Sequence, residues 1–205
     1  MVQARAGAFG ALPSAYDEIL ERSIASNDEL ERSAETLLLV SRYESGEASS
    51  RRECVVLASV VLDVERELAP LSEHKGVEVT LDLDATLAVD GDDRELRRAL
   101  VNLLANAIAW TPSARAIAIT LREHEGRADV RFDDEGYGVP HADVATLFER
   151  VRATPARRGA CSGLGLYLVR RIAEAHAGSV RYVSRAEGGS TFTLTLPLAA
   201  QAVLR

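Results

Sequence analysis

Two asparagines four residues apart have a spacing that could serve chemistry. Asn102 and Asn106 lie in a long amphipathic segment, residues 92–110, and a helix there would place both on one face. An apolar helix gains nothing from two carboxamides on one stripe unless they have partners. A carboxamide oxygen is a neutral hard ligand that suits Mg²⁺, an ion that keeps waters and binds phosphate oxygens. Taken alone, the pair is equally consistent with capped or solvated asparagines.

A second cluster follows a predicted strand and joins one aspartate to two glycines. From Asp134 the sequence reads Asp-Glu-Gly-Tyr-Gly-Val-Pro. An aspartate buried there must accept hydrogen bonds because an unpaired carboxylate is costly, and the exocyclic amine of adenine is a suitable donor. Gly136 and Gly138 would permit tight turns and a close approach of the backbone to a ligand. Alone, this pattern indicates a turn.

A third cluster, residues 162–166, reads Ser-Gly-Leu-Gly-Leu and opens a predicted helix. Glycines before a helix N-terminus expose backbone N–H groups to an anion, and the helix dipole favours negative charge. The segment is not a Walker A loop, because no Gly-Lys-Ser/Thr follows. It also lacks the spacing and the acidic partner of a dinucleotide-binding fingerprint.

The remaining sequence predicts the elements that must position these clusters. Residues 51–200 read as one compact unit in which strands and helices interleave, which favours two layers, a sheet against helices. The predicted strands are 53–57, 77–83, 117–121, 128–132, 180–184 and 191–196. The predicted helices are 60–72, 92–110 and 163–176. Residues 151–162 have no periodicity and are expected to form a loop.

Residues 14–45 predict one long helix that ends at a polar Gly/Ser linker. Apolar side chains recur along it in a heptad-like stripe, made of Tyr16, Leu20, Ile24, Leu30, Ala34 and Leu37. Such a stripe needs a partner. Two interpretations stay open: the helix packs against the rest of the same chain, or it pairs with a second copy.

Composition narrows the class of protein. The 205 residues suggest one domain with an extra segment, and the net charge of −7 argues against a sequence-independent nucleic-acid binder. Of 24 cationic residues only Lys75 is lysine, which we attribute first to genome composition. No membrane segment or signal peptide is evident, and two cysteines far apart fit a reducing compartment. A cytoplasmic location is expected.

In this order and spacing, the three clusters resemble the catalytic ATP-binding domain of bacterial sensor histidine kinases, within the GHKL superfamily. Further motifs are similar: Leu147-Phe-Glu-Arg150 resembles the F box, and residues 188–197 resemble the closing glycine motif and strand. The resemblance implies an α+β protein. Its fold would be a two-layer α/β sandwich of the Bergerat type, a mixed sheet packed on helices, preceded by one long helix.

The resemblance also implies roles for matching residues. Asn106 would hold Mg²⁺ with help from Asn102, Asp134 would bind the adenine amino group, and residues 151–162 would form a mobile lid over ATP. The glycines implied at the nucleotide are Gly136, Gly138, Gly163 and Gly165. Further residues implied in the ATP site are Ala109, Trp110, Val139, Ser162, Leu164, Leu166 and Ser190.

The sequence departs from the family pattern in three places. Residues 1–50 resemble only the second helix and linker of the dimerisation and phosphoacceptor hairpin, and residues 51–205 resemble the catalytic domain. No histidine precedes His74, so the phosphoacceptor is missing, and either this is a fragment or the protein naturally lacks it. Ala109 stands where the family usually has a lysine, and Val151 where it has a second aromatic residue.

The residue type at position 102 distinguishes histidine kinases from other members of the superfamily. ATPases and anti-sigma serine kinases place a glutamate there as general base, whereas Asn102 cannot take a proton at neutral pH. We therefore predict a protein-histidine kinase catalytic domain that binds Mg-ATP and transfers the γ-phosphoryl group to a histidine outside this chain. A cognate response regulator is the expected partner, with a possible homodimer through helix 14–45. The alternative is a non-enzymatic, truncated kinase-like regulator; a serine kinase is disfavoured.

Overall fold

The computed structural model describes residues 36–45, 51–150 and 164–200, together with residues 16, 20, 23 and 34. The chain divides into two compact units, residues 1–45 and residues 46–205, and each is considered by itself. In the first unit, residues 36–44 and the four separate residues are helical. The described residues of the predicted helix over 14–45 are helical except Ser45, which is in a turn, and the remainder of that range lies outside the described residues.

The second unit is built on a five-stranded sheet with the order β2-β4-β5-β7-β6. Its strands are β2 (Glu78–Leu83), β4 (Ala116–His124), β5 (Arg127–Asp134), β6 (Ser179–Ser184) and β7 (Ser190–Pro197). β2 runs parallel to β4, and all other neighbours are antiparallel. The sheet is therefore mixed, as predicted.

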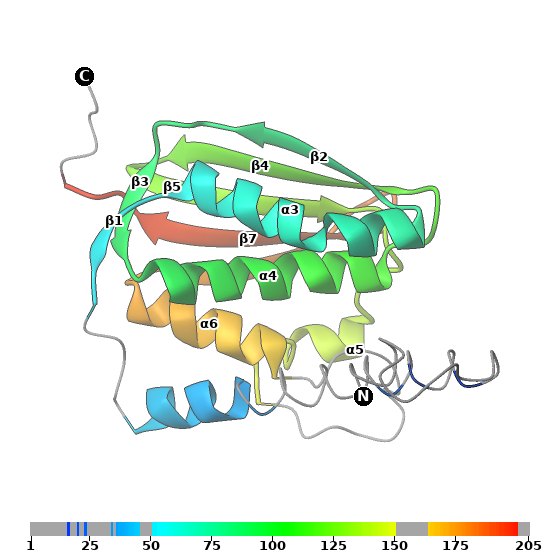
Figure 1. The fold of residues 1–205 in the computed structure, drawn as a ribbon, viewed down its shortest axis with the longest axis horizontal. Helices are drawn as coiled ribbons and strands as arrows, with labels where there is room; N and C mark the ends of the chain where they lie inside the picture. Colours follow the sequence, from blue (N-terminus) through cyan, green and yellow to red (C-terminus); the bar gives the residue numbers. More distant parts are fainter. Residues whose placement is uncertain are drawn as a thin grey trace, which may run out of the picture. The chain divides into compact units, whose positions relative to one another are not determined.

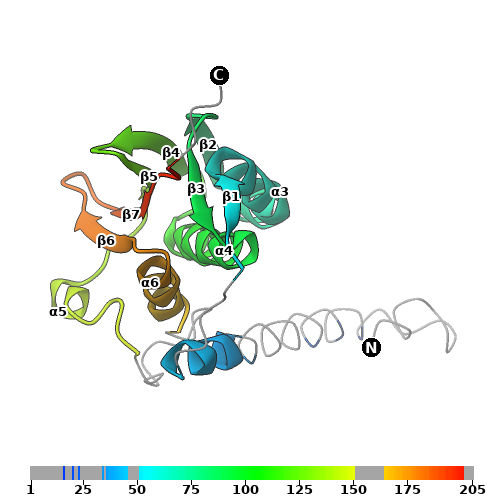
Figure 2. The ribbon, with the colours of Figure 1, turned by 90° about the vertical axis from the view of Figure 1, so that its left-hand side faces the viewer.

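Three long helices cover one face of this sheet (Figures 1 and 2). They are α3 (Leu57–Lys75), α4 (Asp93–Trp110) and α6 (Gly165–Ala175). Alternate residues of each central strand point into the layer between sheet and helices, and on β5 these are Ala128, Val130, Phe132 and Asp134, all buried. The opposite face is polar: Thr191 and Thr195 of β7 donate to Asp133 and Asp129 of β5. The predicted two-layer α/β sandwich is confirmed.

The sequence predicts a turn at Glu125-Gly126 and a hairpin around Gly188-Gly189, and both are present. Glu125 and Gly126, between β4 and β5, have φ of 53° and 74°, and Gly188 and Gly189, between β6 and β7, have φ of 92° and 90°. Glu125 and Gly126 are the central residues of a two-residue hairpin, whose twist matches positive φ at both. Gly188 and Gly189 end the longer loop 185–189 between β6 and β7. Glycine supplies this conformation at no steric cost.

Some elements differ from the sequence prediction. β1 (Glu53–Val56) pairs with β3 (Ala88–Gly91) in a separate two-stranded antiparallel sheet, and β3 was not predicted. Four residues are too few to show an alternating pattern. The helix α3 begins at Leu57 instead of Val60, because Leu57 is fully buried and joins the core at once. The short helix α5 (His141–Val144) was also not predicted.

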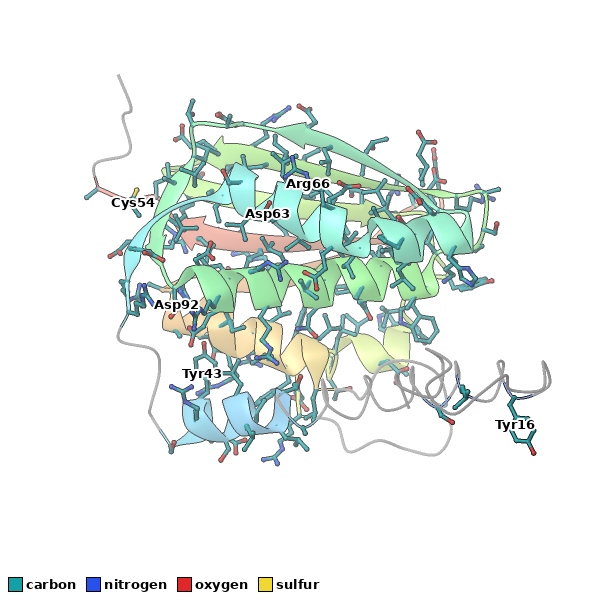
Figure 3. All side chains as sticks on the ribbon, viewed as in Figure 1. Tyr16, Tyr43, Cys54, Asp63, Arg66 and Asp92 are labelled. Carbon is teal, nitrogen blue, oxygen red and sulfur yellow. The ribbon has the colours of Figure 1, made fainter. Side chains whose placement is uncertain are left out.

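The start of α4 is fixed by two contacts. Asp92, which is labelled in Figure 3, caps the helix. Its side chain accepts hydrogen bonds from the backbone N–H groups of Arg94 and Glu95 at 3.0 and 3.2 Å. The Asp92 N–H in turn donates to Nε2 of the buried His176 at 3.1 Å, at the end of α6. Since Nε2 accepts, Nδ1 carries the proton and donates to the carbonyl of Ile172 at 2.8 Å. His176 therefore ties the end of α6 to the start of α4, a structural role.

Among the described residues, no helix is both long enough and apolar enough to cross a bilayer.

Candidate functional site

The C-terminal end of α4 abuts the Asp-x-Gly-x-Gly segment, residues 134–138. A Cβ atom on Gly136 would lie 2.8 Å from the Trp110 carbonyl oxygen and 2.7 Å from Asp134 Oδ1, so no other residue fits there without a shift. The N–H of Tyr137 donates to the same Trp110 oxygen at 3.4 Å. The fold thus brings together the end of the asparagine-bearing helix and the Asp-x-Gly-x-Gly turn.

Asp134 is the buried carboxylate of this region, with only 2% of its surface exposed. Its Oδ1 accepts hydrogen bonds from the backbone N–H groups of Gly136 at 2.9 Å and Ser190 at 3.1 Å. Both backbone donors converge on Oδ1, and the side chain of Ser190 also bonds to the carboxylate. Burial raises the pKa of the Asp134 carboxyl, while the bonds from Gly136 and Ser190 and the charge of Arg185 oppose that shift.

The β6–β7 hairpin supports this turn from behind. Gly189 has φ of 90°, and its backbone packs so closely on the Asp134 carbonyl that a Cβ atom would collide with it. Arg185 donates from Nη1 to that carbonyl at 2.9 Å. The Tyr182 hydroxyl accepts from the Val139 N–H at 3.2 Å. Arg185 and Tyr182 were not found by the sequence analysis, since a single side chain bonded to a distant backbone leaves no pattern.

Aromatic contacts join the F-box segment to the hairpin. Phe148 meets Phe192 of β7 edge-to-face, with ring centroids 6.3 Å apart and an interplanar angle of 84°. The Tyr182 ring also packs on Phe192, with ring centroids 5.3 Å apart and an interplanar angle of 58°. Both geometries are favoured for aromatic pairs. Phe148 therefore anchors residues 147–150 to β7.

The other predicted cluster meets α4 at Asn102. The Asn102 Nδ2 donates to the Arg98 carbonyl at 2.8 Å. This bond leaves Oδ1 facing the start of α6, where a Cβ atom on Gly165 would lie 2.6 Å from it. Leu164, at the N-cap of α6, makes no side-chain cap hydrogen bond. The N–H groups of a helix N-terminus, together with the helix dipole, favour an anion. Asn106 lies one turn further along the same face of α4 and is half-buried.

The structure therefore gathers most of the predicted residues around the C-terminal half of α4. Asn102, Asn106, Leu164, Gly165 and Leu166 form one group, and Trp110, Asp134, Gly136, Gly138, Val139 and Ser190 form the other. Trp110 is 47% exposed and Tyr137 78%, so aromatic surface is open beside the second group. Ser162 and Gly163, together with the predicted lid, lie outside the described residues. The backbone carbonyl of Ala109 accepts a hydrogen bond from the Lys75 ammonium.

The side chains of the site limit which metal ion it could hold and how. Among the residues that the structure describes, no group of three or more His, Cys, Asp or Glu side chains could hold an ion. Two carboxamide oxygens, at Asn102 and Asn106, are too few to replace the shell of Mg²⁺, which usually takes its other ligands from phosphates and water. These residues fit an ion that arrives bound to a polyphosphate.

Comparison with known proteins identifies the family. A family model described as "Histidine kinase-, DNA gyrase B-, and HSP90-like ATPase" matches residues 91–200, which include α4, the glycine turn and the β6–β7 hairpin. The chain belongs to this family. Two similar sequences are the sensor-like histidine kinase SenX3 of Mycolicibacterium smegmatis and the adaptive-response sensory kinase SasA of Synechococcus sp. CC9311. They are 30% identical over 188 residues and 33% over 181, and they cover 90% and 83% of this chain. The chain spans 49% and 47% of their lengths.

Solved structures of histidine kinases share the fold. The mycobacterial sensor histidine kinase MprB aligns with a TM-score of 0.62 and 27% identity over 72% of this chain and 98% of its own. The Acinetobacter baumannii histidine kinase AdeS aligns with a TM-score of 0.72 and 22% identity over 96% of this chain and 91% of its own. Full-length ShkA, solved in complex with AMPPNP, aligns with a TM-score of 0.75 and 24% identity over 96% of this chain and 42% of its own. The family's two-layer fold is therefore the fold of this chain.

Proposed function

We propose that this chain binds Mg-ATP and presents its γ-phosphoryl group to a histidine outside the chain. The observation that carries the proposal is the arrangement of both groups of site residues along one helix. Asn102 and Trp110 are eight residues apart, about 12 Å along α4 at roughly 1.5 Å per residue. That length leaves room for a ribose and phosphates between an adenine at Asp134 and the start of α6.

In this assignment, Asp134 accepts a hydrogen bond from the adenine amino group, and Gly136 and Gly138 admit the ring close to the backbone. The phosphates lie at the start of α6, against Gly163 and Gly165, where N–H groups and the helix dipole favour anions. Asn106, assisted by Asn102, would supply oxygen ligands to the metal. Bound Mg²⁺ neutralises phosphate charge, which is the main requirement of phosphoryl transfer.

The nucleophile in this proposal comes from elsewhere. A carboxamide cannot accept a proton at neutral pH, so Asn102 cannot activate water or serine as a glutamate would. We assign residues 1–50 to part of a dimerisation and phosphoacceptor hairpin with its linker, and residues 51–205 to the catalytic domain. The relatives are named sensor-like and sensory kinases, which supports a response regulator as partner. The heptad-like stripe of residues 14–45 is the feature that would allow a homodimer through that helix.

The test is transfer of radiolabel from [γ-³²P]ATP to a separately produced helical hairpin that carries a phosphoacceptor histidine. We expect label that is labile in acid and stable in alkali, the behaviour of a phosphoramidate. Asp134→Asn should lose both ATP binding and transfer. ATP binding by wild type with no transfer to any histidine hairpin would refute the transferase assignment.

A non-enzymatic regulator is the second candidate, favoured by one observation. Ala109 occupies the position where the family resemblance expects a phosphate-site lysine, so one cation is missing from the neutralisation of phosphate charge. In that case ATP or ADP still changes the fluorescence of Trp110, and no label moves. Absence of any binding, checked by calorimetry, would reduce the assignment to an interaction module.

A further inference from the structure

The only lysine of the chain has a position that composition does not explain. The other 23 of its 24 cationic residues are arginine, so a cation needed only for its charge would be expected to be arginine here too. Lys75 is the last residue of α3, where Gly76 ends the helix with φ of 68°. Its side chain is half-buried and reaches across to α4.

The Lys75 ammonium binds the last turn of α4. Its Nζ lies 2.5 Å from the carbonyl oxygens of both Ile108 and Ala109 and donates to each. The helix α4 has no basic residue in its own last turn. Lys75 therefore supplies two charge-assisted hydrogen bonds and the positive charge that a helix C-terminus favours.

The carbonyls of the last turn of α4 each have a hydrogen-bond partner. The Ala107 oxygen accepts from the N–H of Thr111 at 3.0 Å and from its hydroxyl at 2.8 Å. Lys75 serves the next two carbonyls, those of Ile108 and Ala109. The last, at Trp110, accepts from Tyr137 in the glycine turn at 3.4 Å. Carbonyls at a helix end lack intrahelical partners, and two of them here, those of Ile108 and Ala109, depend on one ammonium group.

We propose that Lys75 is a positioning residue for the nucleotide site. It touches no ligand; it fixes the last turn of α4, whose Trp110 carbonyl forms the wall against which Gly136 is packed. Because Gly136 packs directly against the Trp110 carbonyl, a shift of the last turn of α4 would also move the backbone beside Asp134. The inference rests on the nucleotide-binding function proposed above.

The chemistry of the ammonium explains the choice of lysine. An ammonium is a compact group with three donors and can serve two adjacent carbonyls from one point. A guanidinium is a planar fork whose donors are spread over a larger group. Arginine at position 75 would keep the charge at the helix end while displacing the turn.

The experiment measures ADP and adenosine affinity by calorimetry for wild type, Lys75→Met and Lys75→Arg. Arg66→Met is the matched control, because Arg66 lies on the same helix with 73% of its side chain exposed (Figure 3). Lys75→Met should bind ADP about tenfold more weakly, the order of loss seen when a supporting residue of a site is removed. Adenosine affinity should fall by the same factor, since the affected wall is at the base. Lys75→Arg should be intermediate and Arg66→Met unchanged.

A second pair of measurements separates positioning from general loss of stability. Leu121→Ala, in the buried core of β4, is a control chosen to lower the melting temperature at least as much as Lys75→Met. It should retain ADP affinity when most molecules are folded. Hydrogen exchange at the Tyr137 amide should accelerate in Lys75→Met and not in Leu121→Ala.

Three results would overturn the inference. Lys75→Met could bind ADP as wild type does, Leu121→Ala could lose as much affinity, or Lys75→Arg could match wild type, which would make the charge alone responsible. Failure of wild type to bind ADP is a different result, since it refutes the proposed function. Exchange at the Tyr137 amide would then still decide whether Lys75 fixes the turn.

Discussion

Replacing Asp134 by asparagine should move ligand binding and folding stability in opposite directions. Two backbone N–H groups, those of Gly136 and Ser190, hold Oδ1 and would hold the carbonyl oxygen of an asparagine in the same place. The amide nitrogen of the variant then occupies the position of Oδ2. There it would face the amino group of adenine, and two donors cannot pair.

The expected loss of affinity follows from that exchange. A hydrogen bond to a charged acceptor contributes about 1.5–3 kcal/mol, and a buried donor left unsatisfied costs about 1–3 kcal/mol. Together these give about 2.5–6 kcal/mol, which is roughly 70- to 25,000-fold in Kd. Without ligand, burial of the carboxylate raises the pKa of Asp134, so its charge is unfavourable in the folded state. The variant should therefore melt at the same temperature as wild type or higher at pH 7.

Titration calorimetry with ADP and thermal unfolding measure the two effects on the same samples. Asp133→Asn is the matched control, because Asp133 is the preceding residue of β5 and binds Arg131 and Thr191 on the outer face of the sheet. It should leave ADP affinity unchanged. An Asp134→Asn variant that binds ADP within threefold of wild type would show that this carboxylate does not accept the adenine amine. A melting temperature several degrees lower would refute the argument from burial.

Three further predictions concern pH and two neighbouring positions. The folded-state pKa of Asp134 is raised above its usual 3.8, because burial favours the protonated carboxyl. The protonated carboxyl therefore stabilises the folded state fully below pH 3.8, and this stabilisation is lost as the pH rises through the raised pKa. ADP binding needs the ionised form and should weaken as pH falls through the same range, whereas Asp134→Asn should show no such dependence by calorimetry. Gly165→Ala places a Cβ 2.6 Å from Asn102 Oδ1; it should lower ATP affinity about tenfold and leave adenosine affinity unchanged, with stability within about 1 kcal/mol by urea unfolding. His176→Ala removes a buried ring and its bonds to Asp92 and Ile172 and should cost about 3–5 kcal/mol of unfolding free energy in urea, with a loss under 1 kcal/mol contradicting its role.

The sequence predicted the main elements because their patterns are long. The apolar stripe of α4 extends along an 18-residue helix, and the alternation extends over six residues in β4 and eight in β5. Glycines at the hairpins identified both turns through the positive φ they permit. β3 was missed because its four residues pair only with β1, far earlier in the chain, and a pairing partner cannot be read from so short a segment.

The site was predicted only where residue types and their spacing form a motif. Asp134 and the asparagines could be found from their types and spacing, and the structure brings Asn102 to Gly165 and Asp134 to Gly136. Arg185 and Lys75 act on backbone carbonyls of distant segments. Their partners have no sequence signature, since every residue has a carbonyl. Such supporting contacts become visible only when the fold is known.

The position of Asp134 in the sheet limits how this protein can tolerate insertions and deletions. Asp134 is the last residue of β5, paired with Ile117 on one side and with Ser190 on the other, and it shares its face with Phe132 and Val130. One residue added or removed within β5 would exchange the two faces of the strand and turn the carboxylate to solvent. The same change in the turn at Glu125 would leave the strand pairing near Asp134 intact. Length variation in related chains should therefore accumulate at that turn and be excluded from the strand that ends in the aspartate.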